Sequence, residues 1–412
     1  MTKNFLVLTH VIHHSGGGKL MAYAPYVREM NMWFKNVGKT TVVAPFSGKG
    51  TFAKEEIYET ASPDFKTIPS FDLLSLKNSL KAVFNIPVIA IRIFQEMSRA
   101  DYLHLRCPGN VGLIACFCQL FFPKKPKSAK YAGNWDPEAD QPWSYKLQKW
   151  ILKNSFLTRN MAVLVYGDWP RQTANVRPFF TASFSENEIK EVRKKTFAEP
   201  FTFLFVGNLV AGKQAIEAIR LIKELIEDGS PGTLEIYGDG PEREKLEDFC
   251  KANELIDMVS FKGNKSLEEL KEAYQRAHFV ILPSRSEGWP KAVAEGMFFG
   301  CIPIASRVSC VPWMLDYGKR GVLLQNISQG QQIIVNGSKQ WAVGSGQWAE
   351  DLEKISMLMN DPEEMQRMSK AAKEWSQQYT LEKFEAAIQG LLGKQQQTTD
   401  NKPNSARITT HR

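Results

Sequence analysis

The chain has 412 residues, of which 43% are hydrophobic and 23% charged, a composition typical of a soluble globular protein with two or three domains. No run approaches the roughly 18 apolar residues of a membrane-spanning helix. The N-terminal segment MTKNFLVLTHV lacks the basic region and cleavage site of a signal peptide, so we expect a cytoplasmic protein.

The formal net charge of +8 is unevenly distributed along the chain. Residues 1–195 contain 27 Lys and Arg against 15 Asp and Glu, whereas the remaining residues contain 25 against 29. A basic first half favours an anionic partner such as a membrane surface, although a basic surface without a target fits the same counts. The six cysteines show no repeated pair at zinc-ligand spacing, which predicts reduced thiols.

Strands and helices are predicted to alternate through the first half of the chain. Apolar, β-branched runs predict strands at Phe5–Thr9, Thr40–Ala44, Tyr102–Leu105, Lys130–Ala132 and Ala162–Tyr166. Helical spacing predicts helices at Leu20–Phe34, Asn78–Met97, Val111–Phe122 and Tyr145–Leu157. His13–Lys19 is predicted to be a glycine-rich turn that leads into the first helix.

A polar linker at Ser183–Pro200 precedes a second series of the same kind. The predicted strands are Phe201–Val206, Thr233–Tyr237, Met258–Phe261, Phe279–Leu282 and Ile302–Ala305. The predicted helices are Ala215–Glu227, Pro241–Ala252, Ser266–Arg276, Lys291–Phe299, Gln347–Asn360, Pro362–Gln378 and Leu381–Leu392. A small hairpin is predicted from Ile333–Val335 and Lys339–Val343 around Asn336-Gly337. Residues 394–412 lack periodicity and are predicted to be disordered.

This pattern predicts an α/β protein with two doubly wound, Rossmann-like domains that face each other across a cleft. Residues 1–195 would form the N-terminal, acceptor-binding domain, and residues 196–375 the C-terminal, nucleotide-binding domain. We expect the helix at 376–393 to pack back on the N-terminal domain. Ligands bind such folds at the carboxyl ends of the strands.

Three glycine motifs follow predicted strands. Gly16-Gly17-Gly18-Lys19 is predicted to open a helix, where backbone N–H groups can bind a phosphate. Leu20 stands where a P-loop requires Ser or Thr, and Val42-Val43-Ala44-Pro45 offers no acid for a dinucleotide ribose. A tight turn without a ligand is an equal alternative.

The other two glycine motifs lie in the second half of the chain. Gly207-Asn208-Leu209 is followed by Lys213 at the head of a helix, where an ammonium group suits a diphosphate. Gly238-Asp239-Gly240-Pro241 closes a second strand-to-helix turn. A solvated lysine and a plain turn are the alternatives.

The stretch SEGWPKAVAE places Glu287 and Glu295 eight positions apart. Glu287 precedes a predicted helix and is expected to point into the cleft, whereas Glu295 lies near the packed face of that helix. A buried carboxylate is costly unless it is paired, and the hydroxyl groups of a sugar or ribose are suitable donors to it. A helix-dipole acid and a surface acid are the alternatives.

Together these motifs resemble the retaining glycosyltransferases of family 4, which have the two-domain GT-B fold, and in particular members of the bacterial cell-envelope or polysaccharide type. The Glu-x7-Glu motif of that family matches Glu287 to Glu295, and its Gly-Arg-Leu…Lys-Gly element matches Gly207 to Lys213. The resemblance covers most of the chain and is sharpest from Phe201 to Leu324.

The resemblance implies a UDP- or GDP-linked sugar as donor substrate, with no cofactor and no metal. Glu295 would hold the ribose, Glu287 the donor sugar, and Lys213 the diphosphate. The residues implied in the donor site are Gly16, Gly17, Gly207, Asn208, Lys213, Gly238, Gly240, Ser284, Arg285, Glu287, Gly288, Trp289, Lys291 and Glu295. The absence of an Asp-x-Asp triplet argues against a metal-dependent GT-A enzyme.

The sequence departs from the family pattern at two positions. Asn208 stands where relatives have Arg beside the diphosphate, and Arg106 stands where many have His near the reacting sugar. Arg106 would bind the sugar or an anionic acceptor but cannot act as a base. The residues implied in catalysis are Glu287, Lys213 and Arg106. Those predicted on the acceptor side are His13, His14, Asn134, Trp135 and Asp136.

The expected reaction is transfer of a hexose or related sugar, with retention of configuration, to a hydroxyl of a glycan or lipid-linked acceptor in polysaccharide, lipopolysaccharide or glycolipid biosynthesis. No nucleic acid is expected as a partner. Aromatic and basic residues at Phe121–Lys125 and Trp143–Lys153 suggest peripheral contact with the inner face of the cell membrane. A sugar phosphorylase, a sugar-nucleotide epimerase and a non-catalytic nucleotide-sugar-binding protein are the alternatives.

Overall fold

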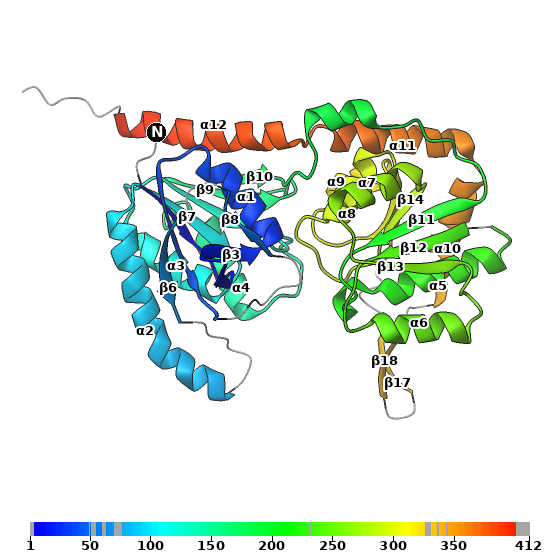
Figure 1. Cartoon of the computed structure of the whole chain (residues 1–412), viewed down its shortest axis with the longest axis horizontal. Helices are drawn as coiled ribbons and strands as arrows, with labels where there is room; N and C mark the ends of the chain where they lie inside the picture. Colours follow the sequence, from blue (N-terminus) through cyan, green and yellow to red (C-terminus); the bar gives the residue numbers. More distant parts are fainter. Residues whose placement is uncertain are drawn as a thin grey trace, which may run out of the picture.

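The structure is a computed structural model that describes residues 4–48, 50, 55–59, 63–69, 76–230, 232–325, 331–335, 338–342 and 345–400. It consists of two α/β lobes side by side, with a long C-terminal helix that lies along one edge of the N-terminal lobe (Figure 1). Within this described part of the chain, no helix combines the length and apolar content needed to cross a membrane.

The N-terminal lobe contains a seven-stranded parallel sheet in the order β10-β9-β8-β7-β1-β4-β6. Its strands are β1 (Asn4–Leu8), β4 (Lys39–Pro45), β6 (Asp64–Ile68), β7 (Tyr102–Cys107), β8 (Lys127–Tyr131), β9 (Met161–Tyr166) and β10 (Val176–Phe179). Every residue of β7, β8 and β9 is buried, because helices cover both faces of a parallel sheet. The covering helices are α1 (Ala24–Phe34), α2 (Leu76–Arg99), α3 (Asn110–Cys118) and α4 (Trp143–Lys153).

The C-terminal lobe repeats this design with a six-stranded parallel sheet in the order β13-β12-β11-β14-β15-β16. Its strands are β11 (Phe201–Val206), β12 (Gly232–Tyr237), β13 (Val259–Gly263), β14 (Phe279–Leu282), β15 (Ile302–Ser306) and β16 (Val322–Leu324). Its helices are α5 (Ala215–Glu227), α6 (Arg243–Ala252), α7 (Leu267–Arg276), α8 (Lys291–Phe298), α9 (Val311–Met314), α10 (Ser345–Met359) and α11 (Pro362–Ser376). The two doubly wound sheets confirm the predicted fold class.

Two antiparallel sheets lie outside these layers. In the first, β2 (His13–Gly16) pairs with β3 (Lys19–Tyr23), which pairs with β5 (Glu55–Ile57). In the second, β17 (Gln331–Val335) pairs with β18 (Ser338–Ala342), which confirms the predicted hairpin strands. The predicted turn residues of that hairpin, Asn336 and Gly337, lie outside the described residues.

The prediction that the first glycine motif opens a helix is wrong. Gly17 and Gly18 have φ angles of 58° and 75° and connect β2 to β3, as in a two-residue hairpin turn whose central residues both require positive φ. Helix α1 begins only at Ala24, with a proline in its first turn. Gly16 and Gly17 therefore do not lie at the N-terminus of a helix.

The C-terminal helix also differs from its prediction. Helix α12 (Leu381–Asp400) continues past residue 393, where disorder was predicted, and residues 401–412 lie outside the described part. Its apolar side chains Phe384 and Ile388 join the core beneath α1, and Gln389 Nε2 donates to Asn36 Oδ1 at 2.9 Å. The last helix thereby attaches the chain that leaves the C-terminal lobe to the N-terminal lobe.

The six cysteines are all unpaired and buried, as predicted for reduced thiols.

Candidate active site

The carboxyl ends of both parallel sheets face a cleft of about 610 Å³ between the lobes. Ligands bind at this edge in doubly wound folds. The N-terminal lobe contributes His10, Tyr26, Glu29, Arg106 and Asn134 among other residues, and the C-terminal lobe contributes Ser286, Glu287, Gly288 and Lys291. Residues far apart in the sequence thus share one polar and aromatic cavity.

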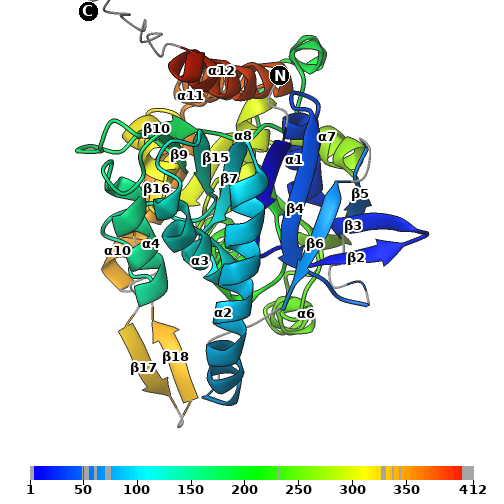
Figure 2. The same cartoon turned by 90° about the vertical axis from the view of Figure 1, so that its left-hand side faces the viewer.

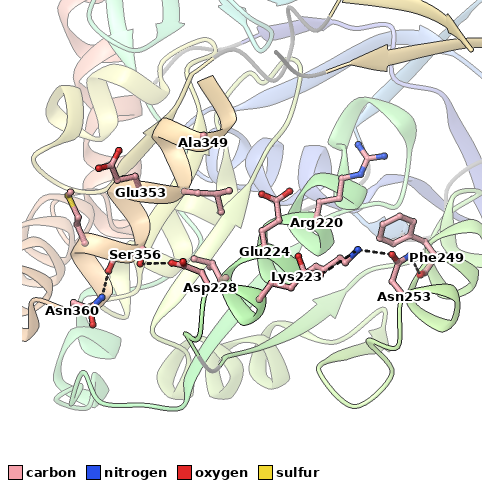
Figure 3. Close-up of a pocket in the computed structure, with 14 residues that line it drawn as sticks. Arg220, Lys223, Glu224, Asp228, Phe249, Asn253, Ala349, Glu353, Ser356 and Asn360 are labelled. Carbon is pink, nitrogen blue, oxygen red and sulfur yellow. Dashed lines mark hydrogen bonds and ion pairs between the residues drawn. The ribbon is translucent and has the colours of Figure 1, made fainter. Parts of the chain in front are cut away.

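A larger hollow of about 1110 Å³ lies away from this edge, among α5, α6 and α10 (Figure 3). Its polar side chains pair largely with one another: Lys223 Nζ donates to Asn253 Oδ1, and Ser356 Oγ donates to Asp228 Oδ2, both at 3.0 Å. None of the predicted site residues lines it. The cleft between the lobes is therefore the candidate active site.

Two glycine motifs of the C-terminal lobe lie against each other. Leu209 N donates to Asp239 O at 2.9 Å, and Gly207 N donates to Tyr237 O at 2.9 Å. A Cβ at Gly238, whose φ is 144°, would lie 1.9 Å from Gly207 O. The sequence requires glycine here because the two strand-to-helix turns touch backbone to backbone.

Gly238→Ala is expected to lower the free energy of unfolding of the C-terminal lobe by at least about 2 kcal/mol, because both the φ angle and the clash oppose a side chain. Urea denaturation followed by circular dichroism measures the change. Gly212→Ala is the matched control, since a Cβ there meets nothing within 4 Å. Equal stabilities of the two variants would contradict the described packing.

Glu287 lines the C-terminal wall of the cleft and forms an ion pair with Lys213, which does not itself line the cleft. Lys213 Nζ donates to Glu287 Oε1 at 2.6 Å, and their side chains are 29% and 8% exposed. The loops that carry them are joined by a hydrogen bond from Arg285 N to Gly212 O at 3.0 Å. Close by in sequence, the buried Ser284 Oγ has no hydrogen-bond partner among the described residues. A cation and a carboxylate therefore stand next to each other at the carboxyl edge of the C-terminal sheet.

Glu295 lies on α8 and does not line the same cavity. Its carboxylate accepts hydrogen bonds from Ser183 Oγ at 2.6 Å and Tyr274 OH at 3.1 Å, and it lines a very small hollow that adjoins the cleft through Thr181 and Lys291. The two partners explain how a carboxylate is tolerated beside apolar residues of α8.

Trp289 fills the space between the lobes. Its ring lies 5.7 Å from that of Tyr166 at the end of β9 and 6.2 Å from that of Trp375 on α11. At the adjacent Gly288, a Cβ would lie 2.7 Å from Ala132 O of the other lobe. The Gly-Trp pair that follows Glu287 thus sets the distance between the two walls of the cleft.

The N-terminal wall holds a buried ionic cluster that sequence reasoning missed in part. Arg106 Nη1 donates to Glu29 Oε1, and Lys130 Nζ lies 3.0 Å from Glu29 Oε2. The Lys130 ammonium also lies within 5.3 Å of the ring centres of Tyr166, Phe179 and Phe384. Glu29 comes from the inward face of α1 and Lys130 from a central strand, where a charged residue is unusual enough to have signalled a function.

Electrostatics keep this cluster charged. Burial alone would raise the pKa of Glu29, but the positive charges of Arg106 and Lys130 outweigh it and lower this pKa to about 2. Burial lowers the pKa of Lys130 to about 8, against the opposing effect of Glu29. Desolvation by the surrounding walls of the cleft and the nearby positive charge of Arg106 lower the pKa of His10, so this cleft residue is neutral near pH 7.

The residues predicted on the acceptor side separate in the structure. Asn134 lines the cleft, whereas Trp135 is buried and donates from Nε1 to Gln172 Oε1 at 3.2 Å. Asp136 Oδ1 accepts from Glu138 N at 2.9 Å within a turn. His13 and His14 are the first two residues of β2. His13 Nε2 bonds to Tyr58 OH at 2.7 Å, and His14 Nε2 lies 3.1 Å from Glu55 Oε2. Trp135, Asp136, His13 and His14 therefore do not line the cleft.

The remaining donor-site residues lie on the hairpin, in the C-terminal lobe between its strands and helices and, for Lys291 and Glu295, on α8. Gly16, Gly17, Gly207, Asn208, Lys213, Gly238, Gly240, Ser284, Arg285, Trp289 and Glu295 do not line the cleft, whereas Gly288 and Lys291 do. Among the described residues there is no group of three or more His, Cys, Asp or Glu arranged to hold a metal ion.

Residues 187–332 match the family model described as "Glycosyl transferases group 1". A protein from Haemophilus influenzae named "Uncharacterized glycosyltransferase" is 26% identical over 206 residues, which cover 50% of this chain and 53% of that protein. The "Poly(glycerol-phosphate) alpha-glucosyltransferase" of Bacillus subtilis is 21% identical over 202 residues, which cover 49% of this chain and 27% of that enzyme. The chain thus spans about half or less of the length of these relatives.

The fold is shared with solved structures over nearly its whole length. The structure of Alr3699/HepE from Anabaena, determined in complex with UDP, superposes with a TM-score of 0.60 at 13% identity and covers 97% of this chain and 100% of that one. A glycosyltransferase from Rickettsia africae superposes with a TM-score of 0.63 at 11% identity, covering 97% and 100%. The chain therefore has a GT-B fold and, over residues 187–332, a region that matches the group 1 glycosyl transferases.

Proposed function

We propose that this protein is a retaining glycosyltransferase that moves a sugar from a UDP- or GDP-linked donor to a hydroxyl of a glycan or lipid-linked acceptor. The observation that carries the proposal is the pairing of Lys213 with Glu287 at the carboxyl edge of the C-terminal sheet. The match of this lobe to group 1 glycosyl transferases and the UDP bound to a protein of the same fold support it. A cell-surface polysaccharide or glycolipid is the proposed product class, in line with the name of the Bacillus relative.

In this proposal the donor separates Lys213 from Glu287. The ammonium of Lys213 forms an ion pair with the diphosphate, and the carboxylate of Glu287 accepts hydrogen bonds from two hydroxyls of the donor sugar. The N-terminus of α8, which begins at Lys291, adds its positive end to the charge that develops on the leaving diphosphate. The protein thus positions the reactants and stabilises the leaving group.

The acceptor hydroxyl approaches from the N-terminal wall. Arg106 stays protonated and cannot remove its proton. His10 lines the same wall, and its lowered pKa keeps it neutral near pH 7. We propose front-face attack, in which the departing phosphate oxygen takes the acceptor proton. This route needs no protein base and no metal ion.

Incubation of the protein with a panel of UDP- and GDP-sugars and a mixture of phospholipid and oligosaccharide acceptors tests this function. Transfer that requires an acceptor and keeps the anomeric configuration, read by NMR, is expected. Turnover that depends on inorganic phosphate would indicate a phosphorylase instead, and donor binding without turnover would indicate a binding protein.

We further propose that one face of the N-terminal lobe contacts an anionic membrane. Helices α2, α3 and α4 lie on that face (Figure 2) and touch one another in sequence order. It exposes large apolar side chains: Val88, Ile91, Phe94, Phe117, Phe121, Trp143, Trp150 and Phe156. The ring of Phe94 lies 5.8 Å from that of Phe121, so the patch runs from α2 to the segment after α3.

Basic side chains surround these apolar groups. Arg92, Lys124, Lys146 and Arg159 are exposed on the same helices and loops, and Trp143, Lys146 and Trp150 share one side of α4 at helical spacing. Aromatic rings with a basic rim match the interface of an anionic bilayer. This contact would hold the enzyme on the inner face of the cell membrane, near a lipid-linked acceptor.

Replacing Trp143 and Trp150 together by Ala is expected to reduce binding to vesicles of phosphatidylglycerol by at least roughly tenfold, because each ring loses a buried apolar area at the interface. Co-sedimentation at low salt measures the effect. Tyr317→Ala is the control, since Tyr317 is an equally exposed ring, 68% against 67% and 60%, on the other lobe. Wild-type protein that stays in the supernatant would refute the contact.

A further inference from the structure

The ionic cluster of the N-terminal wall contains one more positive than negative charge. Two cations, Arg106 and Lys130, share the single carboxylate of Glu29. All three are buried, with side-chain exposures of 11%, 1% and 7%. Among the residues that the structure describes, the aromatic rings of Tyr26, Tyr166, Phe179 and Phe384 pack against these charges. His104 lies near enough to feel their charges and is neutral. An unbalanced buried charge is costly, so the excess positive charge favours binding of an anion here.

The cluster faces the cleft. Glu29, Arg106, Tyr26 and Tyr166 all line it. From the opposite wall Lys291 lines the same cavity and is close enough to contribute to the lowered pKa of Lys130. An anionic group in this part of the cleft would therefore lie between Arg106 and Lys291.

The diphosphate of the donor has a separate cation. Lys213 belongs to the C-terminal lobe and its ammonium is held by Glu287, while Arg106 belongs to the end of β7 in the N-terminal lobe. On this basis we infer a second anion site on the N-terminal wall, in which Arg106, supported by Glu29 and Lys130, binds a phosphate or carboxylate group of the reactant beyond the diphosphate. The inference rests on the proposed function and specifies its substrate class.

The local geometry suits this role. Glu29 holds one terminal nitrogen of Arg106, and the ring of Tyr26 lies 5.5 Å from the guanidinium carbon. These contacts fix the plane of the guanidinium group, so its other N–H groups are preorganised for two parallel hydrogen bonds to an anion. Glu29 and Lys130 are positioning residues, and Arg106 is the binding residue.

The anion has two possible sources: the acceptor, as a phosphate close to its reacting hydroxyl, or the transferred sugar, as a uronic acid carboxylate. In the first experiment the full-length protein, saturated with UDP to occupy the diphosphate site, is titrated calorimetrically with glycerol 3-phosphate, with glycerol as the neutral control. In the second, the affinities for UDP-glucuronic acid and UDP-glucose are compared. A preference for glycerol 3-phosphate indicates the acceptor, and a preference for UDP-glucuronic acid indicates the donor sugar.

Arg106→Gln is expected to weaken the binding of the preferred anion by roughly tenfold or more. It should leave the dissociation constant of UDP within about twofold of the wild-type value. Lys213→Ala is the matched control and should give the opposite result: weaker binding of UDP and unchanged binding of the anion. If Arg106→Gln does not fold, Arg106→Lys is the second variant. It keeps the positive charge but loses the paired N–H donors of the guanidinium group, so the anion is expected to bind about fivefold or more weakly.

The inference is overturned if neither anion is preferred over its neutral analogue, or if the preference is the same in the Arg106 variants and the wild type. It is also overturned if glycerol 3-phosphate binds only where UDP is absent and Lys213 is present. Should only GDP bind, GDP replaces UDP in these titrations. Should neither UDP nor GDP bind, the proposed function fails, but the titration of Lys213→Ala with glycerol 3-phosphate still reports on Arg106 alone.

Discussion

Glu287→Ala is expected to lower the rate of sugar transfer by a factor of about 10² to 10³, because the variant removes a preorganised group beside the reacting sugar. The dissociation constant of the nucleotide should change little, since Lys213 then remains free to meet the diphosphate. Steady-state transfer kinetics and calorimetry with UDP or GDP measure the two quantities. The expected pattern is a fall in kcat with nearly unchanged nucleotide binding.

Two further variants isolate this effect. Glu353→Ala removes an exposed carboxylate of α10 that lines the other hollow, and it should leave the rate unchanged. Glu295→Ala should instead weaken nucleotide binding if Glu295 exchanges Ser183 and Tyr274 for a ribose. Sugar transfer by Glu287→Ala at the wild-type rate would show that the Lys213–Glu287 pair has no role in the mechanism.

Glu29→Gln is expected to lower the free energy of unfolding at pH 7 by about 3–5 kcal/mol, because it leaves Arg106 and Lys130 buried without their counter-charge. The effect depends on pH. The pKa of Glu29 is lowered from 4.5 to about 2 in the folded protein, so its stabilising contribution is complete above pH 4.5 and is lost as the pH falls from there through 2.

Urea denaturation of wild type and variant at pH 7 and pH 3 measures this difference. At pH 3, within the window in which the contribution is being lost, the gap between the two proteins should be smaller than at pH 7. Glu353→Gln is the control and should change stability by no more than about 0.5 kcal/mol. A gap of the same size at both pH values would mean that Glu29 acts through packing rather than charge.

The C-terminal lobe could be predicted well from the sequence. Strands Phe201–Val206 and Phe279–Leu282 and helix Ala215–Glu227 have the predicted bounds, because continuous apolar strands joined by short loops to amphipathic helices leave few alternatives. The glycine turns at Gly207 and Gly238 also lie after the predicted strands. Their contact with each other, however, depends on the pairing of β11 with β12.

The N-terminal lobe could be predicted less well, since its irregular parts depend on long-range contacts. The segment from His13 to Tyr23 has helical spacing in part but pairs as a hairpin with β5, more than thirty residues later. Strands β6 and β10 were missed because they carry polar residues at the edges of the sheet. Arg106, Glu29 and Lys130 meet only through the packing of α1 against the sheet, a contact that no local motif encodes.

The central claim is that Glu287, in the C-terminal wall of the cleft, and its ion-pair partner Lys213 bind a nucleotide-linked sugar. The most direct test is the melting temperature of the full-length protein and of Lys213→Ala across UDP, GDP and their common sugar conjugates. One nucleotide class should raise the melting temperature of the wild type with increasing concentration, and Lys213→Ala should lose most of that shift. A wild type that no nucleotide stabilises, or a shift that persists in Lys213→Ala, would contradict the account.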